Sequence, residues 1–142
     1  MALHRTRLGD LARFDPCLGA GSPMRSAEET ELALRVLARG IWVHATPRVQ
    51  VVHHGFRSAE ASQGLIVDYM FGTGAVFAKH LRLGLPQAPR LLLQMAQAFL
   101  SGAPVVHYSH DRKRRLRLSS FARGFWAGMW KSLDHTTGQF KP

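Results

Sequence analysis

The chain has 142 residues, a formal net charge of +10 and an apolar share of 46%, a composition that suits one globular unit and excludes a disordered chain. Its single cysteine excludes an internal disulfide framework and favours a reducing, cytoplasmic compartment. No apolar run approaches the roughly 18 to 20 residues of a transmembrane helix, and we expect no signal peptide at Met1.

The positive charge is concentrated in the second half of the chain. Residues 1–78 hold eight Lys and Arg against seven Asp and Glu, whereas residues 79–142 hold eleven against two. The second half is therefore suited to an anionic partner, which could be a lipid surface, a nucleic acid or an acidic protein.

The first predicted elements are short. Residues 3–13 are expected to form a short helix, followed by a Gly- and Pro-rich loop. The next helix is predicted to begin after Ser26, because Glu29 follows at the spacing of a capping box, and to stop at Gly40. Residues 41–44 and 49–53 are predicted as strands, with Trp42 in the core.

From about residue 60 the pattern is helical. Apolar residues at helical spacing predict a helix over 60–83, interrupted by Gly72 and Gly74, and further helices over 91–100 and 118–133, the last amphipathic. The tail after Asp134 is expected to fray. The predicted fold class is therefore α/β but helix-rich, with few short strands and a small open-edged sheet.

A series of short motifs runs from residue 14 to residue 57. It consists of the turn Phe-Asp-Pro-Cys-Leu-Gly-Ala-Gly, the acidic helix start at Glu28, Glu29 and Glu31, and then Arg35, Gly40, Pro47 and Val-Val-His53. In this order and spacing the motifs resemble the C-terminal half of the catalytic domain of family 2 glycosyltransferases. Those enzymes have the GT-A fold and use nucleotide sugars.

The resemblance implies two parts, an acceptor-side part of a GT-A domain over residues 1–58 and a basic helical extension over 59–142. The start, Met-Ala-Leu-His-Arg, resembles an internal segment of the family, so that Met1 would be an internal methionine of a longer enzyme. The donor-binding half, with the Asp-x-Asp that holds the metal and diphosphate, would then be missing, since this sequence contains no Asp-x-Asp. We expect the isolated chain to be inactive.

The resemblance also implies site residues. Inverting transfer needs a base for the acceptor hydroxyl, and the family places it at Glu29, with Glu28 assisting. Gly19 and Gly21 would let the acceptor approach the backbone, and His53 would contact a divalent Mn or Mg ion or the diphosphate. The family usually has Asp where this chain has Glu29, so the reach of the base differs by one methylene.

Each of these residues also has a simpler explanation. Glu29 could serve only as the capping-box partner of Ser26. Glu31 and Arg35, four residues apart on a helix, are expected to form a surface ion pair. His53, at the end of a strand, could be a partly buried residue that binds nothing.

The predicted function is transfer of a sugar from a nucleotide-sugar donor to a hydroxyl acceptor, lipid-linked or polysaccharide, with inversion. The basic run 112–117 and the following Trp-containing helix are typical of an interfacial membrane helix and do not favour nucleic acid. We therefore expect peripheral membrane contact through 112–133, at the inner face of the membrane. The simpler explanation of this segment is a helix that packs on the catalytic core. The alternative is a non-enzymatic basic module that binds an anionic membrane or nucleic acid.

Overall fold

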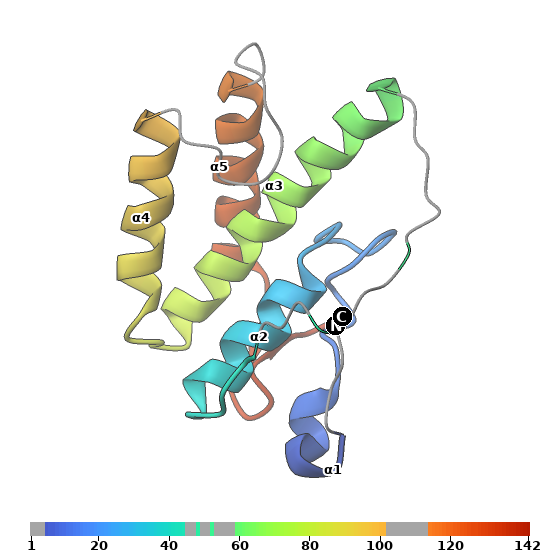
Figure 1. Cartoon of the computed structure of the whole chain (residues 1–142), viewed down its shortest axis with the longest axis vertical. Helices are drawn as coiled ribbons and strands as arrows, with labels where there is room; N and C mark the ends of the chain where they lie inside the picture. Colours follow the sequence, from blue (N-terminus) through green and yellow to red (C-terminus); the bar gives the residue numbers. More distant parts are fainter. Residues whose placement is uncertain (1–4, 45–47, 49–51, 53–58, 102–113) are drawn as a thin grey trace.

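The computed structural model describes residues 5–44, 48, 52, 59–101 and 114–142 (Figure 1). Over these residues the fold is helix-rich, with one two-stranded antiparallel sheet. The elements in chain order are α1 (Arg5–Leu8), the 3-10 helix η1 (Gly9–Ala12), α2 (Glu28–Ala38), α3 (Ala59–Arg82), α4 (Ala88–Ser101), α5 (Arg114–Trp130), β1 (Leu133–Asp134) and β2 (Gln139–Phe140). None of the helices in this described part has the length and apolar character to cross a bilayer.

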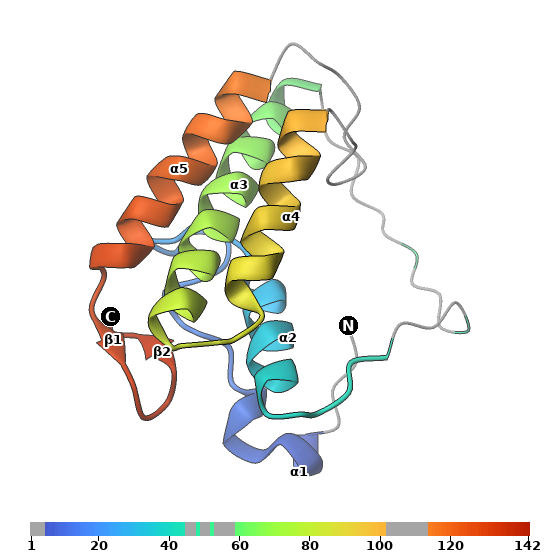
Figure 2. The same cartoon turned by 90° about the vertical axis from the view of Figure 1, so that its left-hand side faces the viewer.

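Helices α3 and α5 lie side by side because glycines let their backbones touch (Figure 2). A Cβ added at Gly124 would overlap the Phe71 carbonyl, and one added at Gly128 would lie 2.6 Å from the Ala75 carbonyl oxygen. Gly74 faces the α5 backbone in the same way. The expectation that glycines interrupt the helix over 60–83 is therefore wrong, since α3 runs through them and uses them for close packing.

The main core joins the loop before α2, helix α3 and the C-terminal hairpin. Phe140 is only 2% exposed, and β2 pairs with β1 with Phe140 opposite Leu133. The tail after Asp134 is therefore ordered, and the expectation that it frays is wrong. The buried residues of this core come from both sides of position 58, and the predicted division into two parts at 58 stays a prediction. They are Cys17, Leu18, Met24, Ala75, Val76, Leu133 and Phe140.

The segment Ile41–His44 is irregular, so the predicted strand is wrong there. Trp42 is 92% exposed, which also contradicts its expected core position. A strand is stable only when a second strand satisfies its backbone groups, and no described residue pairs with this segment. Of the second predicted strand, 49–53, only Val52 belongs to the described residues.

The start of α2 differs from the predicted capping box. Its N-cap is Ala27, in the left-handed region with φ 72°, and no side chain caps the helix. The Ser26 hydroxyl instead donates to the Asp68 carbonyl of α3 at 2.8 Å. The Ser26 backbone lies against Gly72, where a Cβ would collide with it. Long-range docking on α3 has replaced the local cap.

We predict that Gly124→Ala destabilises the protein by about 1–3 kcal/mol or more, because the new methyl meets the α3 backbone. Gly64→Ala is the matched control. Gly64 lies inside α3 with open space around it, so the same substitution should gain up to about 1 kcal/mol of helix propensity. Urea unfolding followed by circular dichroism measures both, and equal stability of the two variants would contradict the packing described.

Candidate functional site

The candidate site is held in place by a buried ion network centred on Lys79 of α3. Its Nζ atom donates to Asp15 Oδ2 and to Glu31 Oε1, each at 2.7 Å, and all three side chains are fully buried. Asp15 lies in the turn before α2, and Glu31 lies in the first turns of α2. One lysine therefore fixes the turn and the helix start relative to each other.

Arg35 completes the network on the α2 side. Its Nε and Nη2 atoms donate to the two carboxylate oxygens of Glu31 at 3.1 and 3.0 Å, and Nη2 also donates to the Arg13 carbonyl. The predicted ion pair thus exists, but the prediction that it lies on the surface is wrong, because both side chains are buried. Burial follows from Lys79, which supplies a second cation for Glu31 and makes a dry environment tolerable for the carboxylate.

Asp15 also connects the network to the C-terminal hairpin. Its Oδ1 accepts the Cys17 backbone N–H at 2.9 Å, and its Oδ2 accepts the Phe140 backbone N–H at 2.8 Å. The Cys17 thiol points to the same strand, 3.4 Å from the Lys141 carbonyl. Burial, followed by the nearby Asp15 carboxylate, raises the pKa of this thiol, which suits the passive role expected for it.

The glycine turn and the first acid of α2 meet beside this network. Gly19 has φ 107°, and a Cβ added there would lie 3.6 Å from the Glu28 carboxyl carbon. Glu28 is half-buried against the turn, whereas Glu29 is exposed. Gly21, with φ 81°, is exposed and has open space where a Cβ would stand. The structure therefore brings the buried Gly19 and Glu28 together and leaves Glu29, the next residue of α2, exposed.

The remaining predicted site residue, His53, lies outside the described residues. Among the residues described, no group of three or more His, Cys, Asp or Glu side chains is placed to hold a metal ion. The described side chains therefore do not form the divalent-metal site that the resemblance implies. The capping-box explanation for Glu29 is wrong, because its expected partner Ser26 bonds to α3.

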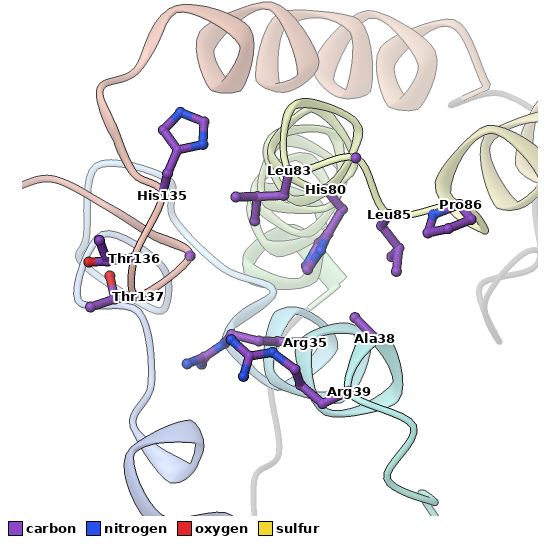
Figure 3. Close-up of a pocket in the computed structure, with 12 residues that line it drawn as sticks. Arg35, Ala38, Arg39, His80, Leu83, Leu85, Pro86, His135, Thr136 and Thr137 are labelled. Atoms are coloured by element: carbon purple, nitrogen blue, oxygen red, sulfur yellow. The ribbon is translucent and has the colours of Figure 1, made fainter.

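A pocket that the sequence did not indicate lies at the other end of α2 (Figure 3). It has a volume of about 280 Å³. Arg35 from α2 and Arg39 directly after it face His80 from α3 across the pocket. The β1–β2 turn closes one side with His135 and Thr137. Both helices direct their C-terminal ends to this region, and the partial negative charge of those ends opposes an anion.

His80 is the chemically unusual residue of this pocket. It is 2% exposed, and its Nε2 has no hydrogen-bond partner, with Glu31 Oε1 3.9 Å away. Burial, reinforced by the neighbouring cations Lys79 and Arg35, lowers its pKa from 6.5 to about 4. The imidazole is therefore neutral at pH 7, as its place between two cations requires.

Comparisons of this chain with protein-family models, curated proteins and solved structures give no match. The roles assigned to Glu28, Glu29, Gly19 and Gly21 therefore stay predictions, supported by residue chemistry and by the geometry above.

We predict that Lys79→Met destabilises the protein by about 3–5 kcal/mol, because it leaves two buried carboxylates without their shared cation. Arg13→Met is the control: it breaks an exposed pair with Asp10 and should cost less than about 1 kcal/mol. Chemical unfolding at pH 7 measures both. A Lys79→Met protein as stable as Arg13→Met would rule out the network as a stability determinant.

A second prediction concerns pH. The pKa of His80 is lowered on folding, so the unfolded chain binds its proton first as the pH falls. Stability should therefore be fully present above pH 6.5 and decline by up to about 3 kcal/mol as the pH approaches 4. His80→Asn should flatten this part of the unfolding free-energy profile. If the difference in unfolding free energy between wild type and His80→Asn were the same from pH 7 to 4.5, the lowered pKa of His80 would be excluded as the cause of the decline.

Proposed function

We propose that the chain is the acceptor-side part of a family 2 glycosyltransferase, which transfers a sugar from a nucleotide-sugar donor to a hydroxyl acceptor with inversion. The observation that carries the proposal is the meeting of Glu28 with Gly19, with Glu29 exposed in the next position. A carboxylate against a glycine turn, followed by a second, exposed carboxylate on the next residue, supplies groups that can bind and deprotonate a hydroxyl.

The two carboxylates have different surroundings, which supports different roles. The Glu29 side chain is exposed and makes no hydrogen bond or ion pair with another described residue, so its carboxylate is available to take the proton of an acceptor hydroxyl. The acceptor oxygen then forms a bond to the anomeric carbon on the face opposite the leaving group, and the bond from that carbon to the nucleoside diphosphate breaks. Glu28, held against the turn, accepts a hydrogen bond from the acceptor and positions it.

The donor and metal sites belong, in this proposal, to a segment that precedes the present sequence in a longer enzyme. The support is Ile41–His44, whose apolar sequence favours a strand but which is irregular, with Trp42 and Val43 exposed. Strands supplied by a donor-binding half would pair with it and cover Trp42. No step is assigned here to the divalent ion, because the described side chains do not form a site for it.

The proposal predicts that purified 1–142 transfers no sugar, and that the codons immediately upstream of Met1 encode, in frame, strands and an Asp-x-Asp. The measurement is the upstream sequence, followed by release of nucleoside diphosphate from a panel of nucleotide sugars by the longer chain. An upstream stop codon with no such segment, or sugar transfer by 1–142 alone, would contradict it.

In the longer chain, Glu29→Gln should lower kcat by about 10²–10⁴-fold, the usual contribution of a general base. Glu28→Gln should raise KM for the acceptor more than it lowers kcat. Asp10→Asn is a matched control, since Asp10 is an exposed carboxylate that pairs only with Arg13 among the described residues. Activity that survives Glu29→Gln unchanged would remove Glu29 as the base and favour the non-enzymatic alternative.

A further inference from the structure

Helix α5 is apolar on two opposite sides, and only one of them is covered. Ser120, Gly124 and Gly128 form the covered side and pack on α3. On the opposite side Trp126 and Trp130 are 64% and 73% exposed. The helix is therefore not the one-sided amphipathic helix expected from the sequence, and its outer side has the character of a contact surface. Leu118 and Met129 are also exposed on this side.

The outer side of α5 is also positively charged. Arg115 and Arg123 are exposed at the same helical angles as the two tryptophans, and α5 contains no acidic residue. Lys131 follows directly after the helix. Figure 2 shows α5 at the edge of the helical layer, with α3 on one side of it and no described element on the other. We call the side formed by Arg115, Leu118, Arg123, Trp126 and Trp130 the outer face.

We propose that this outer face docks on an anionic lipid surface, with α5 lying in the plane of the membrane. The exposed tryptophans, Leu118 and Met129 would enter the boundary between headgroups and acyl chains, and the arginines would bind lipid phosphates. A spanning orientation is excluded by four arginines in 17 residues.

A lipid surface fits this face better than a nucleic acid does. The two indole rings pack edge to face with centroids 5.7 Å apart, so they form one apolar unit and do not stand as separate platforms for bases. Contact with phosphates does not remove the apolar surface of exposed Leu and Met side chains from water, whereas contact with acyl chains does and is therefore favourable. Charge complementarity and apolar area thus point to the same partner.

Docking would leave the candidate site open. Gly72 of α3 faces the Ser26 loop that leads into α2, whereas Gly74 faces α5. Two residues along a helix are separated by about 200° around its axis, so the two contacts lie on opposite sides of α3. The outer face points away from Glu28 and Glu29, and membrane binding can be tested independently of the proposed sugar transfer.

The test uses the complete 142-residue chain and vesicles of phosphatidylcholine with or without phosphatidylglycerol. We expect co-sedimentation with the anionic vesicles, reversal by high salt, and no binding to pure phosphatidylcholine. The double variant Trp126→Ala/Trp130→Ala should bind on the order of tenfold less, or weaker still. Trp42→Ala is the control, because Trp42 is 92% exposed and follows α2, which forms no part of this face.

The arginine contribution is measured in the same way. Arg115→Gln/Arg123→Gln should weaken binding about fivefold for each charge removed, whereas Arg13→Gln/Arg39→Gln removes two exposed charges elsewhere and should bind more tightly than the first pair. Circular dichroism at each step confirms that the variants remain folded.

Three results would overturn the proposal. Equal binding to neutral and anionic vesicles would exclude the charge contribution. Full vesicle binding by the Trp126→Ala/Trp130→Ala variant would exclude the outer face as the binding surface. Binding to duplex DNA or an acidic protein, with no binding to any vesicle, would assign the face to that partner. Glu28→Gln and Glu29→Gln should leave vesicle binding unchanged, so failure of sugar transfer and failure of docking are separate outcomes.

Discussion

The rest of the structure depends on the placement of one lysine cation between two carboxylates in a dry interior. Lys79, Asp15 and Glu31 come from three separate segments, and none of the three could be buried in ionised form without the others. Because Asp15 also binds the backbone of Phe140, the network joins the turn, α2, α3 and the C-terminal hairpin. The packing of Glu28 against Gly19 is a consequence of this arrangement, since it requires the turn and the start of α2 to be held at one distance.

Hydrophobic periodicity was enough to predict the helices of the second half and the existence of α2, because burial of one face is a local property of the sequence. The surroundings of Glu31 and Arg35 were not predictable in this way. An i,i+4 pair has the same spacing whether it lies in water or in the core. What decides between the two is Lys79, 48 residues away from Glu31, and no local pattern indicates such a partner.

The errors in the short elements have the same physical origin. Ile41–His44 has the composition of a strand, but pairing with another strand decides whether it becomes one, and no described segment supplies it. The tail looked polar and frayed, yet Phe140 finds a core position and backbone partners in β1 and Asp15. The Ser26 hydroxyl likewise donates to the Asp68 carbonyl of α3 and does not cap α2. The contacts that hold Glu28 and the glycine turn in place were not predictable from the sequence, because they are long-range.

Helix α3 links the two proposals through its glycines. The loop before α2 packs at Gly72 on one side of α3, and α5 packs at Gly74 on the other. Because the proposed membrane face is the side of α5 that is turned away from α3, both α3 and α5 lie between that face and the acidic end of α2. A helix with its side chains is about 10–12 Å across. An acceptor anchored in the membrane under α5 would have to extend past both helices before its hydroxyl reached Glu29. If both proposals hold, the geometry favours an acceptor that projects beyond the lipid headgroup, such as a growing glycan chain, over the headgroup itself.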